Sequence, residues 1–210
     1  EAEGRHDAVF SFTGKSGKNW DITIEDDHLV DLILKTNRLG CKDADLFMYI
    51  SEAGNEVDLK AEHINQYIRA SSGMGFTAKN FRTWAATSRC AERLAFLSVP
   101  QSEAAMKAWK RRIPSVESID KMWTGGDWTP PTTETGRNKV MLAVIDTVAS
   151  NLGNTRAVCR SSYIHPWFLD AWATGRLADA WAEYADMRAM GNMTPGESTT
   201  LRILKSVIKG

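Results

Sequence analysis

The feature that most constrains the fold is a change of hydrophobic period near the start of the chain. Residues 8–12 and 20–24 alternate between apolar and polar side chains, and the glycine- and lysine-rich stretch 14–18 separates them. This pattern predicts an antiparallel β-hairpin with its tip at 14–18. After Ile24 the apolar residues recur at the helical spacing of about 3.6, so the rest of the chain is expected to be mainly α.

Capping and breaking residues divide the helical part. Asp26 or Asp27 can cap a first helix, and Thr77 can cap a helix whose apolar positions continue to Ala95. Two short segments, 47–50 and 56–59, are compatible with either a strand pair or a loop. Further helices are expected over 61–70, 139–152, 167–190 and 197–209.

These patterns predict a mainly α fold with a small antiparallel β-hairpin or sheet at its amino-terminal end. We expect one domain over residues 1–210. The run Gly125–Pro131 is rich in glycine, proline and threonine, which is typical of an exposed loop or hinge. The expected parts are the hairpin 1–24, a helical part 25–97, an insertion or loop 98–136 and a second helical part 137–210.

The composition limits the class of protein but does not identify what the protein binds. Lysine and arginine number 26 and are balanced by 26 acidic residues, whereas nucleic-acid-binding proteins usually carry a basic excess. The three cysteines, Cys41, Cys90 and Cys159, are widely spaced and fit reduced thiols of a cytosolic protein. The longest apolar stretch is far below the ~20 residues of a membrane helix, so no membrane association is expected.

Two sequence patterns suggest a binding site but lack the residues or the structural context that the site requires. Gly14-Lys15-Ser16 resembles the end of a phosphate-binding loop, but Val9 stands where that loop needs a glycine. A hairpin tip is also the wrong place for a loop that joins a strand to a helix. The four histidines are scattered and lack a second ligand at metal-binding spacing, so no metal site is expected.

Two segments carry residues suited to phosphate chemistry. Arg82 lies in the helical segment Phe76–Thr87, and Tyr163 lies in the segment Leu152–Pro166. Taken singly, Arg82 fits a solvated or ion-paired side chain, and Tyr163 fits a packed amphipathic residue. Neither position alone indicates a mechanism.

Taken together with the hairpin tip, the two segments resemble a known family. The lysine-bearing turn Phe12–Lys18 is followed by Arg82-Thr83-Trp84 and then by Ser162-Tyr163-Ile164-His165-Pro166. Their order and spread are similar to those of the type IB DNA topoisomerases, in particular the bacterial and poxvirus-like branch. The resemblance implies the carboxy-terminal catalytic domain of such an enzyme, with the helical fold that type IB topoisomerases share with tyrosine recombinases.

The resemblance also implies catalytic roles. Tyr163 would attack a DNA phosphate to form a 3′-phosphotyrosyl link, and supercoils would relax without ATP, metal or any cofactor. Lys15 would protonate the leaving 5′-oxygen, and Arg82 would grip the non-bridging oxygens. Asn154 stands where poxvirus members have histidine and bacterial members asparagine; its amide can donate a hydrogen bond but cannot exchange a proton at neutral pH.

Further implied contacts concern DNA and an upstream domain. Lys18, Lys79 and Arg160 are candidate phosphate contacts on double-stranded DNA. The family places a second catalytic arginine and a DNA-clamping domain upstream of the lysine hairpin, so we expect a carboxy-terminal fragment that is impaired without that amino-terminal domain. A monomer in the cytoplasm is expected, associated with the nucleoid if the source is bacterial.

Two alternatives stay open. A tyrosine site-specific recombinase shares the fold and the covalent chemistry, but recombinases carry a His-x-x-Arg pair, and Lys79 occupies the histidine position before Arg82. A non-enzymatic DNA-binding module could keep the same fold without the reaction. Covalent capture of DNA distinguishes that module from either enzyme.

Overall fold

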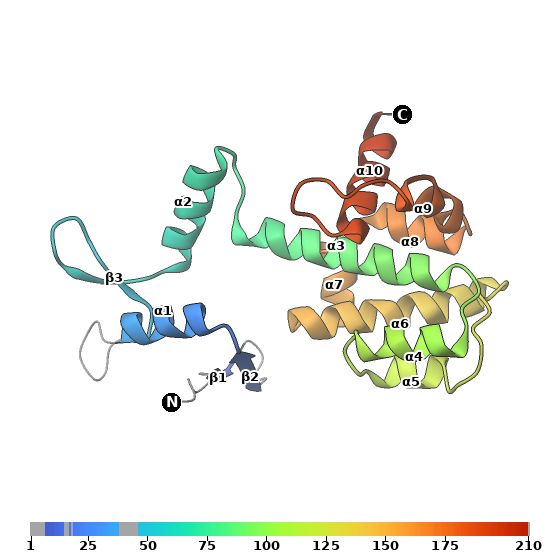
Figure 1. Cartoon of the computed structure of the whole chain (residues 1–210), viewed down its shortest axis with the longest axis horizontal. Helices are drawn as coiled ribbons and strands as arrows, with labels where there is room; N and C mark the ends of the chain where they lie inside the picture. The colour runs from blue at the N-terminus through green and yellow to red at the C-terminus, as the bar shows by residue number, and fades with distance from the viewer. Residues whose placement is uncertain (1–6, 15–16, 18, 38–45, 210) are drawn as a thin grey trace. The chain divides into compact units, whose positions relative to one another are not determined.

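A computed structural model describes residues 7–14, 17, 19–37 and 46–209. The chain divides into two compact units, Glu1–Gly75 and Phe76–Gly210 (Figure 1). The boundary falls inside the predicted helical part 25–97, and the single catalytic domain over 1–210 stays a prediction. The expected fold class is confirmed, since the described residues form two small antiparallel sheets near the amino-terminal end and are otherwise mainly helical.

The amino-terminal unit begins with the predicted hairpin. Strands β1 (Ala8–Thr13) and β2 (Asn19–Ile24) pair antiparallel with Phe10 opposite Ile22. Helix α1 (Asp27–Asn37) follows, and the Asp26 carboxylate caps it by accepting a hydrogen bond from the Leu29 amide at 2.9 Å.

The two ambiguous segments form a second sheet. Strands β3 (Met48–Ile50) and β4 (Glu56–Asp58) pair antiparallel, and α2 (Ala61–Ser72) closes the unit with Gly73 in the left-handed conformation. Among the described residues of this unit, Val30 is the one buried hydrophobic side chain, while Phe10 stacks on Phe47 with ring centroids 6.0 Å apart. So small a core gives the unit little hydrophobic stabilisation of its own.

The carboxy-terminal unit is built around α3 (Ala78–Leu97). Thr77 begins this helix as predicted, and the Asn80 side chain accepts a hydrogen bond from the Thr77 amide at 2.9 Å. Helix α3 packs against α6, α8, α9 and α10 (Figure 1). The other helices are α4 (Glu103–Arg111), α5 (Glu117–Met122), α6 (Glu134–Leu152), α7 (Arg156–Ser162), α8 (Pro166–Ala173), α9 (Leu177–Ala185) and α10 (Pro195–Lys209).

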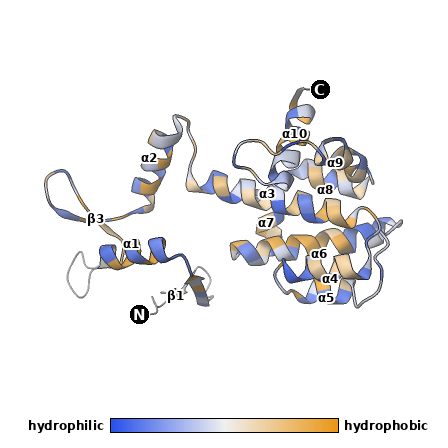
Figure 2. Ribbon diagram, viewed as in Figure 1, coloured by the Kyte–Doolittle hydropathy of each residue, from blue (hydrophilic) through white to orange (hydrophobic). Residues whose placement is uncertain are grey.

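Hydrophobic residues concentrate in the interior of this unit, most clearly along α6 (Figure 2). Leu94 and Leu97 of α3, Val144 and Val148 of α6 and Phe168 of α8 are fully buried. Within the described ranges, no helix is long and apolar enough to cross a bilayer.

The segment 98–136 belongs to this core and is not a peripheral insertion. It forms α4, α5 and the start of α6, and it buries Met106, Ile119 and Trp128. Trp128 lies within the run expected to be an exposed loop, yet its indole N–H donates to the Leu97 carbonyl at 2.9 Å. Glycine and proline indicate irregular backbone correctly here, but they do not report where a neighbouring tryptophan packs.

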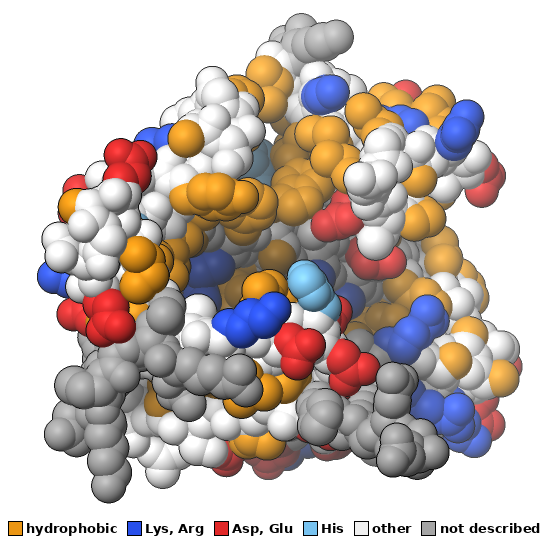
Figure 3. All heavy atoms as spheres, turned by 60° about the vertical axis from the view of Figure 1, so that its left-hand side comes forward, with side chains coloured by type: hydrophobic (Ala, Val, Ile, Leu, Met, Phe, Trp, Pro, Cys, Tyr) orange, Lys and Arg blue, Asp and Glu red, His pale blue; other side chains and the backbone are white. Residues whose placement is uncertain are grey.

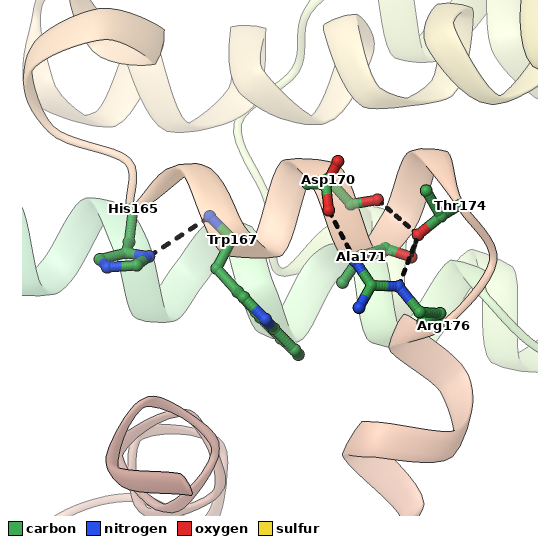
Figure 4. A network of polar contacts seen from close by, with 6 residues as sticks. All are labelled: His165, Trp167, Asp170, Ala171, Thr174 and Arg176. Carbon is green, nitrogen blue, oxygen red and sulfur yellow. Dashed lines mark hydrogen bonds and ion pairs between the residues drawn. The ribbon is translucent and has the colours of Figure 1, made fainter. Parts of the chain in front are cut away.

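The helix expected over 167–190 is interrupted. Gly175 adopts φ 78°, which ends α8 and starts α9. Arg176 secures this turn by donating to Thr174 Oγ1 at 3.0 Å and pairing with Asp170 at 2.6 Å (Figure 4). The apolar positions continue at helical spacing across Gly175, so the periodicity did not indicate this break.

Replacing Trp128 tests the role of the 98–136 segment. Trp128→Ala should lower the free energy of unfolding by about 3–5 kcal/mol, because it empties a buried indole site and orphans the Leu97 carbonyl. Urea denaturation followed by circular dichroism measures this. Lys121→Ala, at an exposed ion pair of the same segment, is the control and should change little; equal stability of both variants would contradict the buried role.

Candidate active site

Tyr163 stands at the point where α7 ends. Thr155 caps the start of this helix by accepting from the Val158 amide at 3.3 Å. At the other end, the amides of Tyr163 and Ile164 both donate to the Cys159 carbonyl, at 3.1 and 3.2 Å. The backbone of Tyr163 is no longer helical (φ −129°, ψ −28°), and its half-buried ring packs on the core. The phenol is therefore held at a helix end and not along a helix face.

Arg82 reaches the same place from α3. Its Cζ atom lies 5.5 Å from the centroid of the Tyr163 ring, a cation–π arrangement. Its Nη2 atom donates to the Leu152 carbonyl at 2.7 Å, at the end of α6 where helix carbonyls lack intrahelical partners. The guanidinium is exposed, so its further N–H donors can bind an anion beside the phenol.

Asn154 follows two residues after Leu152, in the turn between α6 and α7. Gly153 ends α6 in the left-handed conformation, directly after the predicted helical range 139–152, and the Asn154 amide donates to the Ala149 carbonyl at 2.9 Å. The side-chain Nδ2 of Asn154 is buried and has no hydrogen-bond partner among the described atoms. An orphaned buried donor is unfavourable, so this side-chain amide has an unmet hydrogen-bonding requirement within the fold.

A cavity of about 580 Å³ opens beside Tyr163 within the carboxy-terminal unit. Its walls are largely apolar and come from α3, the α7–α8 connection and α10. Representative lining residues are Phe81, Trp84, Thr87, Tyr163, His165 and Leu204. The tyrosine thus borders an open space, with a cation and an orphaned amide on neighbouring segments.

Comparison with known proteins identifies the family of this chain. Residues 2–170 match the family described as the catalytic core of eukaryotic DNA topoisomerase I. The chain belongs to this type IB topoisomerase family. DNA topoisomerase 1B of Acanthamoeba polyphaga mimivirus is 34% identical over 108 residues, which make up 50% of this chain. The match spans 30% of that viral protein.

The other predicted site residues of this topoisomerase core are dispersed. Lys79 lies exposed in the first turn of α3, and Arg160 lies exposed on α7, where it lines a separate concavity with Asn138 and Trp172. Lys15 and Lys18 lie outside the described residues. Among the predicted residues, the structure therefore brings together Tyr163 and Arg82, with Asn154 on the adjoining turn.

Charges of both signs occur close together on the surface. On the face drawn in Figure 3, acidic and basic side chains are interspersed with hydrophobic ones.

Two cysteines lie in the core behind the tyrosine. Burial, and secondarily the neighbouring Cys159, raises the pKa of the Cys90 thiol to about 12. Burial also raises the pKa of Cys159 to about 11, against the opposing effect of Arg82. Both thiols are protonated at neutral pH and serve as packing groups. Cys41 lies outside the described residues.

His165 has a structural partner. Its Nδ1 atom accepts a hydrogen bond from the Trp167 amide at 3.3 Å and so caps α8 (Figure 4). Across the described part of the chain, no group of three or more His, Cys, Asp or Glu residues is arranged to hold a metal ion.

The residue that sequence reasoning missed is Thr87. This side chain is 3% exposed on the core face of α3, and its hydroxyl bonds the backbone on both sides of Ile164. The available signal was a hydroxyl among Ala86, Cys90 and Ala91 on an apolar helix face, because a buried polar group requires a partner.

Asp146 ties the start of α7 to the rest of the fold. It accepts hydrogen bonds from Arg156 Nε at 2.6 Å and from Ser118 Oγ at 2.6 Å, linking α5, α6 and α7. Partial burial alone would raise the pKa of this carboxyl, but the hydrogen bonds from Arg156 and Ser118 outweigh it and lower the pKa below its ordinary value. The ionised form is therefore the one that stabilises the fold.

This shift gives a pH-dependent prediction. Because the folded pKa is lowered, the stabilisation is present above the ordinary pKa of about 4 and disappears as the pH falls through the folded value. Asp146→Asn should lower the unfolding free energy by about 1 kcal/mol at pH 7, with the difference shrinking toward pH 3. Urea melts across this range measure it, with Asp170→Asn at an exposed pair as the control. A difference independent of pH would contradict the ionic role.

Proposed function

We propose that this chain is the catalytic part of a DNA topoisomerase that relaxes supercoils by breaking and rejoining one strand. The observation that carries the proposal is the Arg82 guanidinium over the Tyr163 ring. Tyr163 also lines the open cavity, whereas Arg82 does not. A phenol nucleophile and a phosphate-binding cation are the two groups that such a transesterification needs first.

In the proposed reaction the Tyr163 oxygen attacks a backbone phosphorus of double-stranded DNA. A bond forms between the Tyr163 oxygen and the 3′-phosphate, the bond from phosphorus to the 5′-oxygen breaks, and the phenol gives its proton to water. The free strand end can rotate before the reverse reaction reseals it. Because one phosphodiester replaces another, no ATP is required, and no metal or cofactor takes part.

Arg82 and Asn154 are proposed to stabilise the transition state. Charge builds on the non-bridging oxygens as the fifth bond to phosphorus forms, and preorganised donors meet that charge without rearrangement. Arg82 is held in place through the Leu152 carbonyl, and the Asn154 amide donor is buried and unpartnered.

The leaving 5′-oxygen requires a proton, and Lys15 is proposed to supply it. An alkoxide is a poor leaving group, so a positioned acid accelerates its departure by about 10²–10⁴-fold. Lys15 lies outside the described residues, and its role rests on the lysine-bearing turn of the family. The proposed phosphate contacts of Lys18, Lys79 and Arg160 rest on the same resemblance.

The proposed enzyme also uses an upstream domain. The resemblance to the family implies that this domain supplies a DNA clamp and a second catalytic arginine. We expect a monomer that surrounds duplex DNA in the cytoplasm, at the nucleoid if the source is bacterial.

Covalent trapping tests the nucleophile. On a duplex whose released fragment, the one bearing the free 5′-hydroxyl, can diffuse away, the native protein should form a DNA adduct and Tyr163→Phe should form none, because phenylalanine lacks the attacking oxygen. Gel electrophoresis measures the adduct, for the 210-residue chain alone and for this chain supplied with the proposed upstream domain. Tyr184→Phe is the matched control, and an adduct in Tyr163→Phe would exclude this nucleophile.

The arginine gives a separate prediction. Arg82→Ala should slow single-turnover cleavage by about 10²–10³-fold, and Arg82→Lys should recover only part of the loss, since an ammonium cannot reproduce the planar fork. Rapid-quench kinetics on the same duplex measure it. Arg89→Ala, an exposed arginine of the same helix, should cleave at the native rate; an equal loss there would mean that Arg82 acts only through net charge.

A further inference from the structure

We infer that Thr87 is a positioning residue, whose hydroxyl fixes the orientation of Tyr163 relative to Arg82; the catalytic part of this inference rests on the proposed function. Thr87 Oγ1 donates to the Tyr163 carbonyl at 3.0 Å and accepts from the His165 amide at 3.1 Å. One side chain of α3 thus holds the backbone at both ends of the Tyr163–His165 segment.

The hydroxyls beside Thr87 on α3 behave differently. Thr83 Oγ1 donates to the Lys79 carbonyl at 3.1 Å, and Ser88 Oγ donates to the Trp84 carbonyl at 2.9 Å. Bonding to the carbonyl four residues earlier is the usual way for a hydroxyl inside a helix to be satisfied. Thr87 instead makes its hydrogen bonds to a segment far away in the sequence.

The two backbone groups that Thr87 binds are those that the helix ends leave without regular partners. The Tyr163 carbonyl follows the last turn of α7, and the His165 amide precedes the first turn of α8. The Thr87 side chain is 3% exposed, so water cannot easily replace it. The connection between α7 and α8 is therefore fastened to α3 at this point.

The same helix fixes the position of Arg82. Arg82 lies five residues before Thr87 on α3, and its guanidinium is placed over the Tyr163 ring. A rigid helix that binds the tyrosine backbone through Thr87 also sets the distance from the phenol to the guanidinium. A misplacement of about 1 Å at a reacting group can slow a reaction by about 10²-fold.

The test compares Thr87→Val with Thr87→Ser. Valine has nearly the shape of threonine but can neither donate nor accept, while serine keeps the hydroxyl. Three quantities are measured for each protein: the single-turnover cleavage rate, the DNA dissociation constant, and the rate at which N-acetylimidazole acetylates Tyr163, mapped by mass spectrometry. Tyr67, 73% exposed on α2, serves as the internal reference for acetylation.

We expect Thr87→Val to slow cleavage by about tenfold or more, with the DNA dissociation constant unchanged within about twofold. Acetylation of Tyr163 should become about threefold faster or more, because the half-buried ring is released, while Tyr67 reacts as before. Thr87→Ser should resemble the native protein in all three measurements.

The inference is overturned if Thr87→Val leaves Tyr163 acetylation and cleavage unchanged. It is also overturned if valine and serine reduce cleavage equally together with the melting temperature, since a general packing defect would then explain the loss. If the native protein forms no adduct, the proposed function is wrong, but the inference about Thr87 is still tested. The acetylation rates then decide whether Thr87 positions Tyr163.

Discussion

The buried face of α3 is the surface on which the carboxy-terminal unit is assembled, and its contact with α6 sets the geometry of the site. Leu94 and Leu97 supply apolar packing, while Arg93 donates to Thr147 at 2.7 Å and to Asn151 at 3.0 Å. Burial lowers the pKa of Arg93 to about 10, so the guanidinium stays charged at neutral pH and needs these partners. The pair of helices is thereby held together by polar as well as apolar contacts.

The candidate site consists of helix ends gathered on this pair. The end of α6 offers the Leu152 carbonyl, the next turn carries Asn154, and α7 ends at Tyr163. Helix ends expose backbone groups that cannot bond within the helix, and here Arg82 and Thr87 of α3 bind them. The same contacts therefore satisfy the backbone groups at the helix ends and hold the proposed nucleophile in place.

Much of the local structure could be predicted because its causes are local. Alternation over 8–12 and 20–24 gave the hairpin, Thr77 began α3, and Gly153 ended α6. The failures have different causes: the burial of Trp128 depends on contacts distant in sequence, whereas the break at Gly175 is local but lies within an apolar pattern that continues at helical spacing. Spacing reports which face of an element is apolar but not what covers that face.

By itself, the sequence determined the mainly α fold, the helix caps and, through three short motifs, membership of the type IB topoisomerase family, because residue order and local backbone preference are written in it. Only the tertiary structure decided that Arg82 lies over Tyr163, that the Asn154 amide is buried without a partner, and that Thr87 fastens the tyrosine segment. These are relations between segments distant along the chain. They arise when α3 and α6 bury their apolar faces against each other, and only the packed interior fixes them.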